Sequence, residues 1–422
     1  MTFCALSSAK GMDINMEKKY IDIFAGCGGL SLGLHNAGWK GLFAVEKNED
    51  AFSTLKYNLI DKLGHFEWVD WLNKENYDIN ELLREHKKEL KELRGSIPLV
   101  VGGPPCQGFS MAGQRNAKDK RNQLVNSYVK FVELVRPEYI FFENVHGFTI
   151  AFKDEKNDNR KGIPASAYII KKLKKLGYDL KDEIIDFSEY GVPQKRKRFI
   201  LVGCLNGEAK EFFEILKENK ENFLKAKGLK VITPISEAIG DLLKSNGEVD
   251  CPDCKRFKSG VYGKAVSEYE TFMRDGVNDD DIPDSHRFAN HRENTVTLFK
   301  KMLKECDRGK RLSGQKDNIP DLKKRGVIVL EATQVCNTIT GHPDDYIHYL
   351  EPRIMTVREC ARIQSFPDWF KFRGRYTTGG ETRKIDVPRY SQVGNAIPPL
   401  FAEQVGNALS DMICRRENGL EF

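Results

Sequence analysis

Long hydrophobic runs are missing from this 422-residue sequence. No apolar stretch approaches the ~20 residues that a membrane-spanning helix needs, which excludes a membrane protein. The first residues, MTFCALSSAKGMDINMEKK, lack the apolar block flanked by positive charge that marks a secretory signal, so we expect a cytoplasmic protein. In such a chain, ten scattered cysteines predict reduced thiols rather than a disulfide framework, and one of these thiols could be catalytic.

Paired metal-ligand spacing is also scarce. Cys251 and Cys254 form a CxxC, yet no second CxxC or pair of histidines follows at a suitable spacing. Zinc is therefore the less favoured interpretation, and the role of these two cysteines stays open. We expect His286 and His291 to be polar packing residues or phosphate contacts rather than ligands. Internal repeats and low-complexity tracts are absent too, which excludes a repeat protein.

Length and charge set broad bounds. A chain of 422 residues is too long for one ordinary domain, so we expect two. The net charge of +6 is compatible with a polyanionic partner, but many enzymes that bind no polyanion carry a similar charge. Charge alone therefore decides little about function.

Short apolar runs alternate with amphipathic stretches from Tyr20 to about Gly203. The runs YIDIF, LFAVE, PLVVGG, YIFFENV and RFILVG predict strands, whereas SYVKFVELV and AYIIKKLKKLG predict helices. Apolar runs without strict alternation are typical of parallel strands covered on both faces, so the fold class is α/β with a Rossmann-like doubly wound sheet. Ligands bind at the carboxyl ends of the strands in such a sheet.

Beyond Gly203 the alternation of strand and helix patterns ends, and a lysine-rich stretch follows. Helical spacing returns in TVRECARIQSF and in QVGNAIPPLFAEQVGNAL, after which the last helix is expected to rejoin the first domain. We therefore predict a catalytic and cofactor-binding domain at 1–204 and 376–422. A smaller, irregular domain with a hinge is predicted at 205–375.

A glycine-rich turn follows the first predicted strand, in DIFAGCGGL. Gly26 and Gly28 would let a ligand approach the backbone closely, although a merely tight strand-to-helix turn would use the same glycines. About 20 residues later Glu46 ends the next strand, where a carboxylate can hold both hydroxyls of a ribose. Together the two features indicate an adenosine-bearing cofactor.

A cysteine stands in the loop GGPPCQGFS, directly after the strand PLVV. Cys106 follows a stiff Pro-Pro pair at the carboxyl end of a strand, which would aim its thiol outward as a nucleophile requires. A small buried cysteine is the commoner fate of a cytosolic thiol. The flanking prolines and glycines build a loop, however, and argue against burial.

Two further motifs place charged groups at strand ends. Glu143, in ENV after YIFF, would ordinarily be solvated or cap a helix. In QKRKR, before RFILVG, Arg196 and Arg198 alternate onto one face of a strand. A basic surface run is the plain interpretation, but paired arginines also hold base or phosphate oxygens.

These motifs, in this order, resemble those of the DNA cytosine-5 methyltransferase family of bacterial restriction-modification systems. DIFAGCGGLSLGL is similar to the family's cofactor loop, GGPPCQGFS to its nucleophile loop, ENV to its catalytic acid motif and QKRKR to its arginine motif. TVRECARIQSFPD and QVGNAIPP resemble the late motifs that flank the hinge. The resemblance covers nearly the whole chain and implies an S-adenosylmethionine-dependent methyltransferase fold with a target-recognition domain.

The resemblance also implies a mechanism at carbon 5 of a cytosine flipped out of the duplex. Cys106 would add to carbon 6 and make carbon 5 nucleophilic, because cytosine cannot take a methyl group directly. Glu143 would protonate N3. Arg198 would hold the carbonyl at carbon 2, and Arg196 would support the nucleophile loop or the backbone. Gln107 and Ser110 are candidates to fill the space that the base leaves.

The implied cofactor is S-adenosyl-L-methionine, which leaves as S-adenosyl-L-homocysteine. The resemblance gives its binding set as Phe24, Gly26, Gly28, Gly29, Leu30, Glu46, Asp70, Pro105 and Asn395. Asp70 would contact the adenine, and Pro105 and Asn395 would line the methionine end. Lys47 stands where some relatives have a tryptophan, so a ring stacked on the adenine from that side is in doubt.

The region from Leu205 to Ile354 is the part that reads the DNA in this family. Within it, 286–325 holds twelve Lys or Arg against five Asp or Glu, which favours phosphate contact over a merely solvated basic helix. Thr338-Ile339-Thr340-Gly341 resembles a threonine-containing recognition element. The expected partners are double-stranded DNA and a cognate restriction endonuclease acting on the same site, with the enzyme itself a monomer.

Two alternatives remain from the sequence. A branch of the same family methylates transfer RNA with the same loop and acid, but the long recognition region favours DNA. A DNA-binding adaptor with a degenerate catalytic domain is disfavoured because Cys106, Glu143, Arg198 and Asn395 are all intact.

Overall fold

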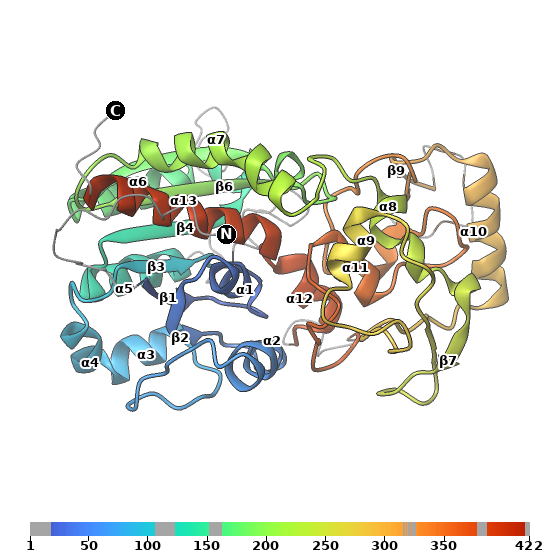
Figure 1. The fold of residues 1–422 in the computed structure, drawn as a ribbon, viewed down its shortest axis with the longest axis horizontal. Helices are drawn as coiled ribbons and strands as arrows, with labels where there is room; N and C mark the ends of the chain where they lie inside the picture. Colours follow the sequence, from blue (N-terminus) through green and yellow to red (C-terminus); the bar gives the residue numbers. More distant parts are fainter. Residues whose placement is uncertain are drawn as a thin grey trace, which may run out of the picture.

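A central sheet and a smaller, irregular lobe make up the fold (Figure 1). The computed structural model describes residues 18–105, 123–151, 163–314, 317, 319, 322, 326–377 and 386–417. In the described chain the large sheet has the strand order β2-β1-β3-β4-β6-β5. Its strands are β1 (Lys19–Ile23), β2 (Lys40–Val45), β3 (Leu99–Gly102), β4 (Tyr139–Val145), β5 (Asp179–Asp186) and β6 (Lys197–Cys204).

The sheet is mixed rather than parallel throughout. Strands β2, β1, β3 and β4 are parallel, as expected, whereas β6 runs antiparallel to both β4 and β5. The parallel prediction was therefore wrong for β6, and the edge strand β5 was not predicted. The link from β5 to β6 is too short for a crossover helix, which forces the antiparallel pairing. Strand β5 escaped notice because DLKDEIID is charged along an edge that faces water.

Helices cover the sheet in two groups that follow from the strand order. Helix α1 follows β1 and leads to β2 on one side, whereas α5 leads from β3 to β4 on the other, so right-handed crossovers place them on opposite faces. Accordingly α1 packs with α13, and α13 with α7, while α5 packs with α3, α4 and α6. The bounds are α1 (Gly29–Asn36), α2 (Glu49–Leu55), η1 (Lys56–Lys62), α3 (Ile79–Glu85), α4 (Lys87–Glu92), α5 (Leu124–Val135), η3 (His146–Thr149), α6 (Ala165–Lys175), η4 (Phe187–Tyr190), α7 (Lys210–Ala226) and α13 (Pro399–Glu417).

The chain's last helix returns to the sheet lobe and packs closely on α1. A Cβ on Gly33 would lie 2.3 Å from the Ala402 Cβ, so glycine is what allows the two helices to touch. The indole Nε1 of Trp39 donates to the Gly406 carbonyl at 2.9 Å. The predicted domain boundary after residue 204 stays a prediction, and α7, just beyond it, also packs against α13.

The smaller lobe is built from short elements around the late motifs. A three-stranded sheet, ordered β11-β10-β9, packs with α10 over a separate small apolar core. The elements are α8 (Ile235–Ile239), η5 (Gly240–Leu242), η6 (Lys244–Asn246), β7 (Glu248–Asp250), β8 (Lys258–Gly260), α9 (Glu268–Met273), α10 (Glu293–Glu305), β9 (Arg311–Leu312), β10 (Val327–Val329), η7 (Pro343–Asp345), β11 (Tyr346–Ile347), α11 (Val357–Ile363) and α12 (Arg389–Asn395).

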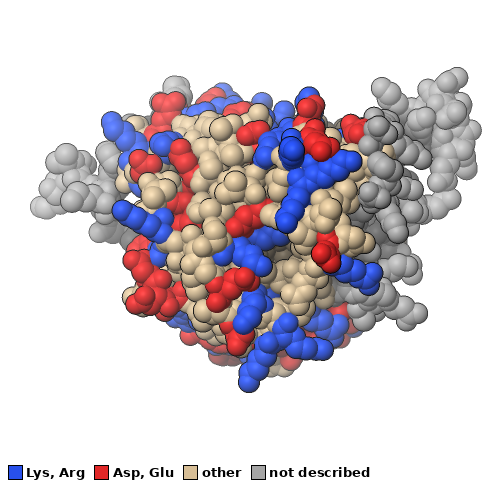
Figure 2. All heavy atoms as spheres, turned by 90° about the vertical axis from the view of Figure 1, so that its right-hand side faces the viewer, with Lys and Arg blue, Asp and Glu red and all other residues tan. Residues whose placement is uncertain are grey.

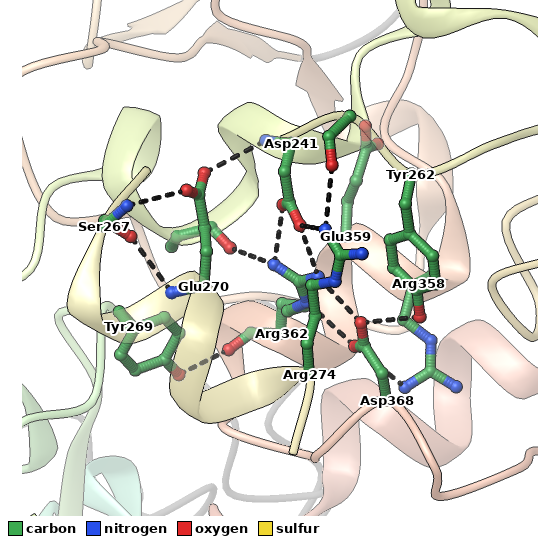
Figure 3. Close-up of polar contacts among 12 residues, drawn as sticks. Asp241, Tyr262, Ser267, Tyr269, Glu270, Arg274, Arg358, Glu359, Arg362 and Asp368 are labelled. Atoms are coloured by element: carbon green, nitrogen blue, oxygen red, sulfur yellow. Dashed lines mark hydrogen bonds and ion pairs between the residues drawn. The ribbon is translucent and has the colours of Figure 1, made fainter. Parts of the chain in front are cut away.

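A buried ionic network ties α11 to its neighbours (Figure 3). The Arg362 guanidinium donates to Asp368 at 2.7 and 2.8 Å and to Asp241 at 2.8 and 3.0 Å, and all three side chains are fully buried. Arg274 and Arg358 approach the outer sides of the same carboxylates. Removing one member would leave an uncompensated buried charge, so the network fixes the position of α11 against η5.

In the described part of the chain, no helix has the length and apolar character needed to cross a membrane.

Candidate active site

The predicted chemical motifs meet at one edge of the sheet. The carboxyl ends of β1, β2, β3 and β4 lie there, and β6 begins there because it runs antiparallel. Connections leave β1 and β3 in opposite directions, so this edge holds the topological switch point at which doubly wound sheets bind ligands. Ile23 pairs with Gly102 and Gly102 with Phe142, which sets the glycine-rich turn beside the loop that leads to Cys106 and that loop beside Glu143.

The glycines of the turn after β1 serve different purposes. Gly26 has a φ of 58°, and a Cβ there would meet nothing within 4 Å, so the space beside its backbone is open to a ligand. Gly28 has a φ of 93°, but its Cβ would lie 2.6 Å from Leu59, and a Cβ on Gly29 would lie 2.4 Å from the Ile397 carbonyl. Packing therefore requires Gly28 and Gly29. Phe24, half-buried, also has a left-handed φ of 67°.

Glu46 lies at the end of β2 with both carboxylate oxygens engaged by backbone. Its Oε2 accepts from the Gly26 N–H at 2.9 Å, and its Oε1 accepts from the Asn48 N–H at 2.7 Å. Burial raises the pKa of this carboxyl, while the N–H donors oppose the rise. Each oxygen keeps a further lone pair, so the carboxylate beside the open space at Gly26 fits a ribose. Lys47, next in sequence, points to Asp78, with 2.8 Å between Nζ and Oδ2.

The remaining cofactor candidates are spread over this end of the sheet. Leu30 is buried in α1, whereas Asp70, Pro105 and Asn395 are exposed, with Asn395 at the end of α12. Among the described residues, no hydrogen bond or ion pair joins Asp70 to Glu46.

Asp22, at the start of the glycine-rich motif, was not predicted as a site residue. It is 1% exposed on β1, and its Oδ2 accepts from the Ser31 hydroxyl at 2.6 Å. Burial raises the pKa of Asp22 to about 7. Its place in the glycine-rich motif was visible, but burial of a carboxylate within an apolar strand cannot be read from the motif.

Glu143 and Arg198 form a nearly buried ion pair at the site edge. The Arg198 Nε lies 2.8 Å from the Glu143 Oε1, and their side chains are 10% and 12% exposed. Burial raises the pKa of Glu143, and the positive charges of Arg198 and Arg196 oppose the rise. A Cβ on Gly103 would lie 2.9 Å from the Glu143 Oε2, so the loop after β3 approaches the carboxylate closely only because this residue is glycine.

Asn144 joins the acid strand to the predicted nucleophile loop. Its Nδ2 donates to the Pro104 carbonyl at 3.1 Å, and its Oδ1 accepts from the Val145 N–H at 2.9 Å. The structure thus fixes the loop beside Glu143 up to Pro105. Cys106, Gln107 and Ser110 lie outside the described residues.

Arg196 is buried against backbone carbonyls and, unlike Arg198, makes no ion pair with Glu143 in the described structure. It is 1% exposed, and its guanidinium donates to the carbonyls of Gly394 at 2.8 Å, Ile339 at 3.2 Å and Ala396 at 3.3 Å. The two arginines of QKRKR therefore have different surroundings. Arg198 meets the acid, and Arg196 meets backbone from two distant segments.

The threonine-containing element 338–341 has its hydroxyls engaged within the protein. Thr338 Oγ1 donates to the Lys195 carbonyl at 2.6 Å, and Thr340 Oγ1 donates to Asp345 at 2.8 Å. The basic stretch includes α10, at the outer end of the smaller lobe. On that end Lys and Arg are mixed with Asp and Glu (Figure 2). Residues 323–325 lie outside the described residues.

The CxxC of the smaller lobe is a turn after β7. Cys251 is buried, with its Sγ 3.2 Å from Asp253, and Cys254 accepts from Arg287 Nη1 at 3.5 Å. His286 is fully buried against Thr356, and His291 is half-buried. The described residues contain no group of three or more His, Cys, Asp or Glu arranged to hold a metal ion.

Comparison with known proteins points to one family. The family model described as C-5 cytosine-specific DNA methylase matches residues 18–411. The type II methyltransferase M.XorII of Xanthomonas oryzae pv. oryzae is 30% identical over 415 residues, covering 92% of this chain and 84% of its own length. The type II methyltransferase M1.HphI of Haemophilus parahaemolyticus is 30% identical over 403 residues, covering 94% and 88%.

Solved structures share the fold. A prophage-encoded E. coli protein described as a DNA modification methyltransferase superposes with a TM-score of 0.63 at 24% identity, covering 94% of this chain and 99% of its own. The Dnmt2 methyltransferase of S. pombe gives a TM-score of 0.52 at 14% identity, covering 95% and 99%. At these identities the likeness concerns architecture.

Proposed function

This chain belongs to the C-5 cytosine-specific DNA methylase family, and from that membership we propose how its own residues carry out the reaction. It is a DNA (cytosine-5-)-methyltransferase, in which bound S-adenosyl-L-methionine supplies the methyl group for carbon 5 of cytosine. The observation that carries the residue roles is the buried Glu143–Arg198 pair, which lies beside the loop leading to Cys106.

We assign the steps on the base to Cys106 and Glu143. The Cys106 thiolate adds to carbon 6 of the flipped cytosine, and the electron pair of the C5–C6 bond moves through the ring toward N3. Glu143 gives its proton to N3, which leaves carbon 5 as an enamine carbon able to take the methyl group. Burial supports this role because a raised pKa keeps the carboxyl protonated closer to neutral pH. After methyl transfer a base takes the carbon 5 proton, the C6–S bond breaks to release Cys106 as its thiolate, and the N3 proton returns to Glu143.

Arg198 would orient both Glu143 and the base for the proton transfer to N3. Its Nε already holds Glu143, and its remaining N–H groups include one that donates to the Lys197 carbonyl at 2.9 Å. A guanidinium has five donors in a fixed fork, so the same side chain can donate to the base carbonyl at carbon 2. We propose that this is its contact with substrate.

The residues at the switch point would hold the cofactor. Glu46 would bind the ribose hydroxyls, and the open backbone at Gly26 would admit the ligand. Phe24 would contact the adenine or sulfonium face. Pro105 and Asn395, both exposed at this end of the sheet, would line the methionine end.

The region 205–375 is proposed to choose the target sequence in double-stranded DNA. A companion restriction endonuclease for the same site is a further proposal, supported by the type II names of the relatives M.XorII and M1.HphI. A monomeric state and a cytoplasmic location are proposed from the sequence alone. A transfer RNA substrate is the alternative, because a branch of the family that the motifs resemble methylates RNA with the same loop and acid.

A trapping experiment tests the assignment of the nucleophile. Duplexes with 5-fluorocytosine in place of cytosine should form an adduct that survives denaturant, because fluorine at carbon 5 does not leave as a proton. Cys106→Ser should form none while still binding S-adenosylmethionine, and Cys306→Ser, a half-buried thiol in the smaller lobe, should react like the wild type. An adduct with Cys106→Ser would remove Cys106 from the mechanism. The same modified base in transfer RNA separates the two substrates.

A further inference from the structure

Arg196 holds a position between the two lobes that no step of the reaction uses. We propose that it is a positioning residue, whose guanidinium fixes the recognition segment 336–341 against the strand that carries Arg198. The base-holding pair and the DNA-reading lobe would then keep one relative geometry. This inference rests on the proposed function, since it concerns how that site is aligned with its DNA sequence.

The guanidinium joins three parts of the chain that are far apart in sequence. Two N–H groups reach the Gly394 and Ala396 carbonyls at the end of α12, and another reaches the Ile339 carbonyl in the recognition segment. Its own backbone is fixed as well: the Arg196 N–H donates to Asp186 at 3.1 Å, and its carbonyl accepts from Phe187 at 3.1 Å. A shift of the recognition segment or of the end of α12 would therefore break hydrogen bonds to Arg196, because the backbone of Arg196 is held in place.

The recognition segment is also docked on the arginine motif by its backbone. Cys336 and Gln194 form an isolated parallel bridge, in which the Cys336 N–H donates to Pro193 at 3.0 Å and the Lys195 N–H donates to Cys336 at 2.8 Å. The Gln194 side chain accepts from the Ile339 N–H at 2.8 Å and donates to Gln364 at 2.8 Å. The segment is thus bonded to the three residues that directly precede Arg196, Pro193 to Lys195.

The chemistry of the contact explains why an arginine is needed. Its partners are carbonyl oxygens, and no ion pair joins it to a carboxylate of the described chain. Hydrogen bonds therefore compensate the burial of its two terminal nitrogens, whereas the buried Nε has no hydrogen-bond partner among the described residues. A planar fork can donate to two segments at once, whereas a lysine ammonium reaches fewer carbonyls from one point. With both terminal nitrogens engaged and 1% exposure, the side chain could contact a base only after these bonds broke.

A second contact lies next to the first and can be changed without touching Arg196. A Cβ on Gly341 would lie 2.8 Å from the Ser391 Oγ and 3.2 Å from its Cα, and a Cβ on Gly394 would lie 2.6 Å from Thr340. The recognition segment and α12 therefore lie so close together that a Cβ at either glycine would overlap the other segment. Gly341→Ala should push the segment off α12 while leaving every arginine in place.

The test compares sequence choice with chemistry in the full-length enzyme. Arg196→Lys and Gly341→Ala should raise the KM for DNA and lower discrimination between target and near-target sequences by roughly tenfold or more, read by bisulfite sequencing of a methylated library. Their affinity for S-adenosylmethionine should match the wild type. Lys197→Gln changes an exposed basic neighbour of Arg196 in the same motif; it is the control and should keep the wild-type profile.

The opposite pattern would overturn the proposal. If Arg196→Lys lowered kcat with an unchanged methylation profile and KM, Arg196 would act on the base, and an unchanged profile for a folded Gly341→Ala would remove the segment's role. Should Arg196→Lys fail to fold, Gly341→Ala decides alone. Failure of the proposed function is recognised separately, because the wild type itself would then methylate no DNA.

Discussion

Replacing Glu143 by glutamine tests the acid while nearly preserving its shape. In the wild type the Arg198 Nε lies 2.8 Å from the Glu143 Oε1. The amide of glutamine keeps an oxygen for this contact, but it has no acidic proton to give to N3. A positioned acid contributes roughly 10²–10⁴-fold to the rate, or about 3–5 kcal/mol of barrier. We expect the single-turnover methylation rate of Glu143→Gln to fall within that range while DNA affinity stays close to that of the wild type.

The substitution also affects folding, and the two effects can be separated. It replaces a charged hydrogen bond between side chains that are 10% and 12% exposed by a neutral one, so the free energy of unfolding should fall by about 1–3 kcal/mol. A fall of that size leaves the protein folded at 25 °C unless its stability is already marginal. Glu138→Gln, just before the opposite end of the same strand, removes one carboxylate far from the site and serves as the control.

The pH dependence gives an independent reading. Because burial raises the pKa of Glu143, the protonated form persists above the usual range, and the wild-type rate should fall as pH rises through that folded pKa. Glu143→Gln should lack this limb, when stopped-time methylation is followed across pH. A variant rate within tenfold of the wild type, or an unchanged alkaline limb, would show that Glu143 is not the acid.

Three further expectations concern the turn after β1. Burial raises the pKa of Asp22 from 3.8 to about 7, so its contribution to stability is present at low pH and is lost as pH rises between those values. In denaturant titrations at pH 8, the free energy of unfolding of Asp22→Asn should therefore exceed that of the wild type by at most ~4 kcal/mol. Near pH 4 the two proteins should be equally stable. Glu46→Gln should weaken S-adenosylmethionine binding roughly 10–100-fold in calorimetry, and an unchanged affinity would exclude the ribose contact. Gly28→Ala should lower the melting temperature, because its Cβ would meet Leu59, whereas Gly26→Ala should lower cofactor affinity. Equal losses of cofactor affinity in the two variants would contradict the separate roles of these glycines.

The sequence predicted the sheet well wherever a short stretch of residues is enough to identify an element. Five of the six strands of the large sheet and the glycine turn were evident, because buried strands appear as continuous apolar runs and turns need glycine. The direction of β6 was not evident, since an apolar run is the same in either orientation. That direction is what brings Arg198 to Glu143: a parallel β6 would begin at the opposite edge of the sheet.

Individual roles were harder to predict than motifs. Gly26 and Gly28 look alike in the sequence, yet one borders open space and the other packs on Leu59, a residue 31 positions away. Arg196 and Arg198 alternate in sequence, but their surroundings depend on Ile339 and Gly394, which only the folded chain brings near. Long-range contacts of this kind leave no local signal. The smaller lobe has short elements and a charged network in which Arg362 bonds Asp241 and Asp368, and it was for the same reason predicted only as irregular.

The most direct measurement combines purified enzyme, labelled S-adenosylmethionine and a library of unmethylated double-stranded DNA, read by bisulfite sequencing. The account predicts label in DNA and protected cytosines confined to one short sequence context, with neither in a Cys106→Ser preparation. Label in transfer RNA but not in DNA, or methylation by the Cys106→Ser protein at the wild-type rate, would contradict it.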